Sequence, residues 1–286
     1  MFRIFTYKQL SFLCVLLCLI LLGGSAFNVI LPNIQTMGTA GIKVPVVMYH
    51  QISDNPKILG DYAITPELLR GDFEYMKKHN INPVSFQDLF TYIKTGEKLP
   101  ENPVVITFDD GERSFLTKVL PLLREYNYPA NINVVGSLVA LYSQNGDTDD
   151  RYAYLNEQDI KLLSTEPLVE LGYHSYDMHS LSTRRGMAQL YGESDEIYIN
   201  KITDDIKKFQ EMFLQITGEK AIIAAYPYGI RNDTLTDVLK NEGFTVTLTC
   251  RETANTLTTG GDLYELGRFN RPYKISEQVF FESIFK

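Results

Sequence analysis

Residues 104–111, Val-Val-Ile-Thr-Phe-Asp-Asp-Gly, decide the fold class of this chain. The first five residues are apolar except Thr107, as expected of a parallel strand that is covered on both faces. Asp109 and Asp110 follow at the carboxyl end of this predicted strand, and Gly111 loosens the backbone so that both side chains can reach one cavity. Asp-Asp-Gly is also an ordinary turn sequence, so the triplet alone leaves a polar loop tip as an alternative.

Short apolar runs alternate with helical patterns through the rest of the chain. Helix starts are predicted at Thr65, at Ser85 with Asp88 as its capping-box partner, and at Asn156. Seven or eight strand–helix units predict an α/β fold, a distorted parallel (β/α) barrel of about seven strands rather than an open doubly wound sheet. The other predicted strands span residues 44–49, 131–135, 168–173, 221–226, 244–248 and 264–269.

The N-terminus is predicted to be a targeting segment. Arg3 and Lys8 precede an almost wholly apolar run at residues 10–22, and the small residues at 24–26 suit a signal peptidase. The apolar stretch continues to Leu31, about the length that spans a bilayer, so a cleaved signal and a retained membrane anchor both remain open. We expect a signal peptide or signal anchor at 1–31, a linker at 32–43, and a single domain at 44–286 outside the cytoplasm.

Composition excludes several classes of partner. The formal net charge of −8 gives no electrostatic footprint for nucleic acid. No glycine-rich phosphate loop follows any predicted strand, so we expect no nucleotide. Of the three cysteines only Cys250 lies in the predicted domain, which rules out a disulfide framework there.

Three of the four histidines fall at predicted strand ends or in the loops after them. His50 ends the first strand of the domain, and His174 and His179 follow the strand at 168–173, whereas His79 is most simply a solvated residue at a helix end. The five-residue spacing lets His174 and His179 converge only if His174 ends the strand and the chain folds back. Two imidazoles with one aspartate leave coordination positions open, as in a catalytic divalent metal site. Solvated or structural loop histidines are the alternative.

These stretches together, in this order, resemble the polysaccharide deacetylases of the NodB-homology type, carbohydrate esterase family four. Asp109-Asp110 is similar to the first motif of that family, His174 with His179 to the second, and Tyr-Pro-Tyr-Gly at 226–229 to the third. His50 in its strand precedes the others, which resembles the circularly permuted subgroup that includes poly-N-acetylglucosamine deacetylases. The resemblance extends from about residue 44 to the C-terminus.

The resemblance implies a metal site and its chemistry. Asp110, His174 and His179 would hold a divalent ion, zinc in the first place, although cobalt, nickel or iron could use the same ligands. Asp109 would act as general base and His50, with an unperturbed pKa of about 6.5, as general acid. The remaining implied roles are an oxyanion contact from the Tyr228 backbone N–H and, in place of the arginine that the family often has where Ala225 stands, orientation of Asp109 by Arg268.

By resemblance, the expected function is removal of N-acetyl groups from an N-acetylglucosamine-containing polysaccharide, either an exopolysaccharide or peptidoglycan. The alternatives are an O-acetyl esterase acting on xylan-type glycans and a noncatalytic carbohydrate-binding protein of the cell surface. The expected partners are the acetylated polysaccharide and, if the N-terminal segment is retained, the membrane. The chain has no tryptophan, so the aromatic substrate contact of the family is missing, and Tyr176 and Phe269 are the candidates to replace it.

Overall fold

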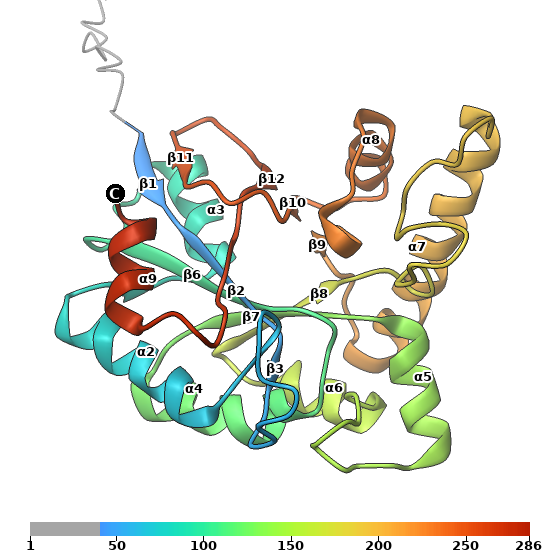
Figure 1. Ribbon diagram of the computed structural model, residues 1–286. Helices are drawn as coiled ribbons and strands as arrows, with labels where there is room; N and C mark the ends of the chain where they lie inside the picture. The colour runs from blue at the N-terminus through green and yellow to red at the C-terminus, as the bar shows by residue number, and fades with distance from the viewer. Residues whose placement is uncertain (1–40) are drawn as a thin grey trace, which may run out of the picture. The chain divides into compact units, whose positions relative to one another are not determined.

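A curled parallel sheet organises residues 41–286, the part of the chain that the computed structural model describes (Figure 1). Its strands follow the order β12-β10-β9-β8-β7-β6-β2-β13, and β5 pairs with β6 beside this path. Every pairing in this sheet is parallel. The strands are β2 (Val46–Tyr49), β5 (Asn82–Pro83), β6 (Pro103–Phe108), β7 (Ala130–Val134), β8 (Val169–Tyr173), β9 (Ile223–Ala225), β10 (Val246–Leu248), β12 (Leu263–Leu266) and β13 (Phe269–Asn270).

One segment joins the two edges of this sheet. β12 pairs with β10 at one edge and β13 pairs with β2 at the other, although only Gly267 and Arg268 separate the two strands in sequence. With β12 and β13 counted as one position, seven strands form a distorted barrel, so the predicted fold is confirmed. The closure brings Arg268, which is fully buried, next to the end of β6.

Alternate residues of the strands divide the core into two layers. Val47 and Ile106 belong to the larger cluster, which packs the strands against the surrounding helices. Their neighbours Val46 and Val105 belong to a smaller cluster that fills the barrel and includes Leu89 and other apolar residues of helix α3 (Phe86–Thr95). Helix α3 therefore covers the amino end of the barrel and leaves the carboxyl end for the polar side chains described below.

The predicted helix starts are confirmed. Thr65 caps α2, and complete capping boxes begin α3 at Ser85 and α6 at Asn156. Helix α5 was not predicted, because Val135 at its start offers no capping side chain. The helices are α2 (Pro66–Lys78), α3 (Phe86–Thr95), α4 (Leu120–Tyr126, after a π-helical turn at Phe115–Val119), α5 (Gly136–Asn145), α6 (Glu157–Leu163), α7 (Asp195–Thr217), α8 (Asp233–Asn241) and α9 (Glu277–Ile284).

The beginning of the described region differs from the prediction. Strand β1 (Ile42–Val44) starts before residue 44 and pairs antiparallel with β11 (Asn255–Leu257), and Pro45, which lacks an N–H, separates it from β2. A further small sheet joins β3 (Gln51–Ile52) to β4 (Ala63–Ile64). Between residues 41 and 286, none of the helices has both the length and the apolar character to cross a bilayer. The targeting segment predicted at 1–31 lies outside the described residues.

Candidate metal centre and active site

Two adjacent carboxylates face one cavity at the carboxyl end of β6. Asp110 and Gly111 both adopt left-handed backbone conformations, with φ of 71° and 80°, and so turn the chain sharply after the strand. Because of this turn, Asp109 and Asp110 line the same cavity although they are neighbours in sequence. A Cβ at Gly111 would lie 3.0 Å from the side chain of Val134, so the position needs glycine for space as well as for its backbone angle.

The histidine pair converges on Asp110. His174 directly follows β8, and Ser175, with φ of 72°, turns the chain so that the rings of His174 and His179 lie 4.9 Å apart. The Nε2 atoms of His174 and His179 are 3.4 Å and 3.2 Å from Asp110 Oδ1. One potential ligand atom from each of the three residues lies within 4.8 Å of the others.

These three residues fit a divalent cation. Metal–ligand bonds of about 2.0–2.2 Å in a tetrahedral site place neighbouring ligand atoms about 3.4 Å apart, close to the two separations from Asp110 Oδ1. That oxygen is buried and receives no hydrogen bond from the described part of the chain, which is costly without a further partner. Two imidazoles and one carboxylate also match the donors that zinc and its neighbours prefer.

Contacts behind the two imidazoles set their orientation. His174 Nδ1 lies 2.9 Å from the main-chain oxygen of Ala225, so Nδ1 carries the proton and Nε2 is left as a lone-pair donor toward Asp110. The His179 ring stacks on Tyr228, with ring centroids 4.7 Å apart. Tyr228 has φ of 59° in the short helical turn Pro227–Gly229, which brings it to the cavity wall.

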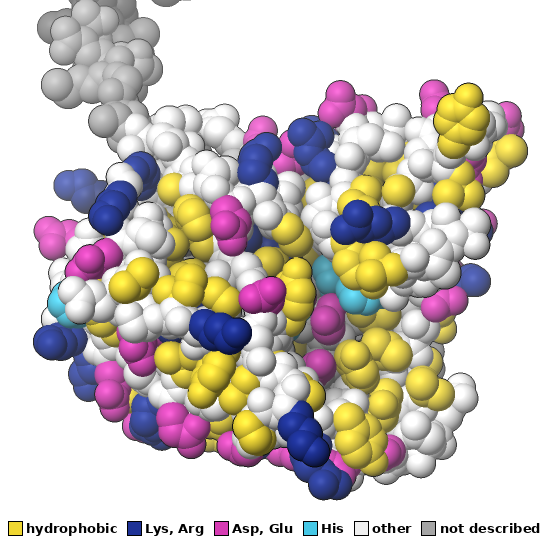
Figure 2. All heavy atoms as spheres, in the orientation of Figure 1, with side chains coloured by type: hydrophobic (Ala, Val, Ile, Leu, Met, Phe, Trp, Pro, Cys, Tyr) yellow, Lys and Arg dark blue, Asp and Glu magenta, His cyan; other side chains and the backbone are white. Residues whose placement is uncertain are grey.

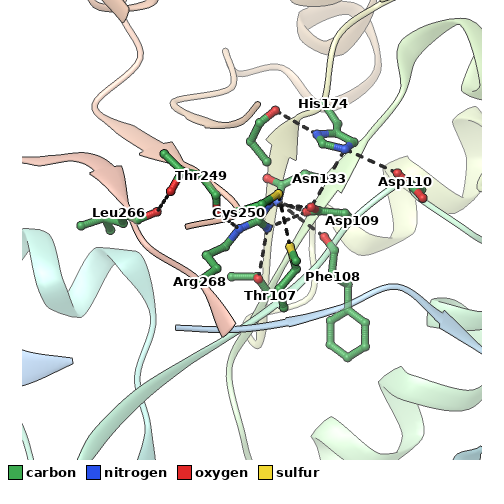
Figure 3. A network of polar contacts seen from close by, with 12 residues as sticks. Thr107, Phe108, Asp109, Asp110, Asn133, His174, Thr249, Cys250, Leu266 and Arg268 are labelled. Atoms are coloured by element: carbon green, nitrogen blue, oxygen red, sulfur yellow. Dashed lines mark hydrogen bonds and ion pairs between the residues drawn. The ribbon is translucent and has the colours of Figure 1, made fainter. Parts of the chain in front are cut away.

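Asp109 is held from behind by Arg268 (Figure 3). Arg268 Nη1 and Nη2 donate to Asp109 Oδ1 and Oδ2 over 2.8 Å and 2.7 Å, and Asn133 Nδ2 donates to Oδ1 over 2.8 Å. Burial raises the pKa of the Asp109 carboxyl, but the charge of Arg268, the neighbouring His174, the hydrogen bonds from Arg268 and the nearby His50 together outweigh burial and hold this pKa below its usual range. Asp109 is therefore a buried carboxylate that stays ionised at neutral pH.

His50 lines the same cavity from the end of β2. Burial lowers the pKa of its imidazole from the ordinary value, although Asp109 and Asp110 oppose this shift. The sequence-based expectation used the unperturbed pKa, which the surroundings of His50 change. Its Nδ1 is buried without a hydrogen-bond partner, and the ring meets the edge of Tyr62 at 4.9 Å between centroids.

The cavity has a volume of about 580 Å³, and Figure 2 shows histidine side chains at the bottom of a hollow on this face. Six of the seven predicted site residues line the cavity, and Arg268 lies behind Asp109. Tyr62 and Leu181, which are 64% and 63% exposed, also line it. Tyr176 and Phe269 instead pack against the larger core cluster, so they do not take the position of the missing aromatic contact.

Sequence reasoning missed Asn133, the third donor to Asp109. A signal was present, because Asn131 and Asn133 alternate with apolar residues in the predicted strand 131–135, which places both on one face. The structure shows that this face is the barrel interior: Asn131 donates to the main-chain oxygen of Glu170 and Asn133 to Asp109.

Comparison with known proteins defines the class of protein. A model of the polysaccharide deacetylase family matches residues 96–247, more than half of the chain. The chain therefore belongs to the polysaccharide deacetylase family.

Individual relatives have names that are more specific than the family name. The chain is 26% identical over 217 residues to a poly-beta-1,6-N-acetyl-D-glucosamine N-deacetylase of Escherichia coli K12, a match that covers 69% of this chain but 32% of that protein. It is 25% identical over 234 residues to the protein of the same name from Staphylococcus epidermidis, covering 79% and 74% of the two chains. The chain thus spans about a third of the length of the E. coli relative and about three quarters of the staphylococcal one.

Solved structures share the fold. A de-N-acetylase from Aggregatibacter actinomycetemcomitans superposes with a TM-score of 0.73 and 23% identity, over 84% of this chain and 99% of that chain. IcaB from Ammonifex degensii gives a TM-score of 0.67 and 23% identity, over 81% and 93% of the two chains. At this level of identity the likeness supports the architecture of the barrel.

Proposed function

We propose that this protein is a metal-dependent deacetylase that removes N-acetyl groups from poly-β-1,6-N-acetylglucosamine or a related polysaccharide outside the cytoplasm. The observation that carries the proposal is a three-residue cluster suited to a metal, next to an ionised carboxylate at the open end of the barrel. The names of the relatives favour this substrate over peptidoglycan.

Asp110, His174 and His179 would hold the cation, with zinc as the first expectation and cobalt, nickel or iron as substitutes. When bound, a divalent cation supplies a Lewis acid for the acetyl carbonyl and makes a water molecule more acidic. The hydrogen bond from His174 to Ala225 O keeps the unprotonated ring nitrogen turned toward this position.

Asp109 would take the proton of the attacking water. Arg268 and Asn133 fix the carboxylate and keep it ionised, so it is ready to accept a proton without rearrangement. Arg268 would thereby orient Asp109 in place of the arginine that the family often has where Ala225 stands. It approaches Asp109 from the segment that closes the barrel.

His50 would protonate the departing amine nitrogen as the amide C–N bond breaks. Burial lowers the pKa of this imidazole and favours its neutral form in the free protein. His50 would therefore take up a proton as negative charge develops on the substrate, and would pass that proton to the amine nitrogen. The backbone N–H of Tyr228 would donate to the carbonyl oxygen of the acetyl group, and a well-placed donor of this kind contributes about 3–4 kcal/mol.

The proposed organisation is a signal peptide or signal anchor at residues 1–31, a linker at 32–43 and the deacetylase domain at 44–286. The basic and then apolar start of the sequence supports export. The exported enzyme would encounter its polysaccharide, which is too large to enter the cell, at the cell surface or in the medium.

Acetate release tests the proposal. Purified full-length protein is incubated with β-1,6-linked N-acetylglucosamine oligomers and, separately, with peptidoglycan, before and after treatment with a chelator. We expect acetate from the oligomers, loss of activity with the chelator and recovery on adding Zn²⁺ or Co²⁺. Acetate release equal to that of the Asp109→Asn variant on both substrates would refute the proposed function.

A further inference from the structure

We propose that Asn133 is a positioning residue that fixes the carboxylate of Asp109 and leaves its Oδ2 atom as the proton acceptor. This inference rests on the proposed function and adds a residue to it. Asn133 lies in β7 and points into the barrel beside Arg268 (Figure 3).

The two oxygens of Asp109 have different surroundings. Oδ1 accepts from Arg268 Nη1 and from Asn133 Nδ2, each over 2.8 Å. Oδ2 accepts from Arg268 Nη2 over 2.7 Å and lies 4.0 Å from His174 Nε2. Each carboxylate oxygen has about two lone-pair sites. The bond from Asn133 therefore occupies the second lone pair of Oδ1. Oδ2 keeps one free lone pair, which lies on the side of the histidines.

Stability alone does not explain an asparagine at this position. Asn133 is 0% exposed, and within residues 41–286 its own Oδ1 has no hydrogen-bond partner. A buried polar atom without a partner destabilises the folded state. Leucine has nearly the same shape without that unpaired oxygen, so what asparagine adds is the 2.8 Å bond to Asp109, beside a longer contact of 3.5 Å from the same Nδ2 to the main-chain oxygen of Phe108.

The neighbouring strand leaves room for this amide. A Cβ at Gly172 in β8 would lie 2.1 Å from Asn133 Oδ1, whereas the nearest main-chain atom, Ile223 O, would be 3.1 Å away. Any side chain at Gly172 would thus push the amide of Asn133 out of place. Gly172 thus leaves the space that the Asn133 amide occupies when it donates to Asp109.

Asn131 provides a matched control in the same strand. It lies two residues earlier on the same face, is also 0% exposed, and also has an unpaired Oδ1. Its Nδ2 donates to the main-chain oxygen of Glu170 over 3.1 Å instead of to Asp109. The two asparagines therefore differ chiefly in the acceptor of their amide groups, which is Asp109 for Asn133 and the main chain of Glu170 for Asn131.

The test compares Asn133→Leu with Asn131→Leu in the full-length protein. The measurements are kcat and KM for acetate release from β-1,6-linked N-acetylglucosamine oligomers, the thermal midpoint and the bound metal. We expect Asn133→Leu to lower kcat on the order of 10- to 100-fold, with KM, thermal midpoint and metal content unchanged. Asn131→Leu should keep kcat within about threefold of wild type, the scatter expected where no catalytic group moves.

Gly172→Ala provides a second test of the role of Asn133 if the leucine variant does not fold. It removes no polar group, and the added Cβ would collide mainly with Asn133 Oδ1 at 2.1 Å, since Ile223 O and Asn131 Nδ2 lie at 3.1 Å and 3.2 Å, so it should reproduce the loss of kcat at constant KM. Retention of wild-type kcat in folded Asn133→Leu, or in Gly172→Ala where the leucine variant fails to fold, would overturn the inference. A wild-type protein that releases no acetate would instead refute the proposed function, so the two failures are distinguishable.

Discussion

Two arginine–aspartate pairs lie close together on the segment that closes the barrel. Arg268 binds both oxygens of Asp109, and Arg271, three residues later, binds both oxygens of Asp72 in α2. Both arginines are at most 1% exposed. Judged by charge, burial and bidentate geometry, the two pairs are nearly the same.

Their surroundings differ. Asp72 accepts a further bond from Tyr49, and Arg271 Nη1 donates to the main-chain oxygens of Pro272 and Ile275, so this pair is enclosed by protein groups. Asp109 instead lines a cavity next to Asp110. A buried ion pair therefore does not identify a site by itself. What identifies the site is that the carboxylate of Asp109 keeps one side open toward a cavity that also contains a cluster of potential metal ligands.

Removing the charge of Asp109 should have the largest effect on activity. Asp109→Asn keeps the shape of the side chain but removes the proposed base, so we expect kcat to fall on the order of 10²- to 10⁴-fold. The variant should still bind metal, because Asp110, His174 and His179 remain, whereas His174→Ala should lose it. Acetate release and metal content of the purified variants decide this, and near-normal turnover in Asp109→Asn would remove the distinction between the two pairs.

The equivalent change in the second pair should affect stability. Asp72→Asn leaves the charge of Arg271 buried without a counterion, which is expected to cost about 3–5 kcal/mol in the free energy of unfolding. Denaturant unfolding measures this loss, and acetate release per folded molecule should match wild type. A fall in kcat in the folded fraction would mean that the enclosed pair also serves the site.

Replacing each arginine by lysine sharpens the comparison. Lysine keeps the charge but cannot donate two parallel bonds to a carboxylate. We expect Arg268→Lys to lower kcat on the order of 10-fold or more, because the carboxylate of Asp109 is no longer fixed. Arg271→Lys should lower the thermal midpoint with little change in kcat. Equal kinetic effects of the two variants would contradict the separate roles.

A third carboxylate, partly buried, is bound by backbone N–H groups instead of an arginine and should respond to pH. Glu170 accepts from the backbone N–H groups of Phe86 and Gln87 at the start of α3, and burial raises its pKa from 4.5 to about 6. The folded protein then holds this proton more tightly than the unfolded chain. Its contribution, about 1–2 kcal/mol, is full below about pH 4.5 and is lost as the pH rises through about 6.

Unfolding free energies measured at pH 4.5 and pH 7 test this expectation. In Glu170→Gln the side chain can still accept from the backbone but does not titrate, so the free energy of unfolding at pH 4.5 minus that at pH 7 should be lower than in wild type by that amount. An unchanged difference would show that Glu170 titrates normally.

Much of the fold could be predicted because it depends on local patterns. The apolar run of β6, the capping box at Ser85 and the alternation of strands and helices each report on neighbouring residues. Helix α5 lacked such a signal, since Val135 cannot cap it. The closure of the barrel by β12 and β13 depends on pairing with strands far away in sequence, which no local pattern encodes.

The site was predictable in its residue types but not in its fine structure. Spacing and order indicated Asp109, Asp110 and the histidines, and Ala225, which stands where the family often has arginine, pointed to Arg268 as its replacement. The bond from Asn133 to Asp109, the room left by Gly172 and the lowered pKa of His50 arise from packing between strands. Such contacts follow only from three-dimensional distances.

Anomalous diffraction from crystals of the protein grown with Zn²⁺ would show directly whether a cation binds at Asp110, His174 and His179. We expect one peak about 2.0–2.2 Å from a carboxylate oxygen of Asp110 and from the Nε2 atoms of His174 and His179, with none beside Asp72. A zinc peak bound by other residues, with the Asp110 carboxylate turned away from the two imidazoles, would contradict this expectation.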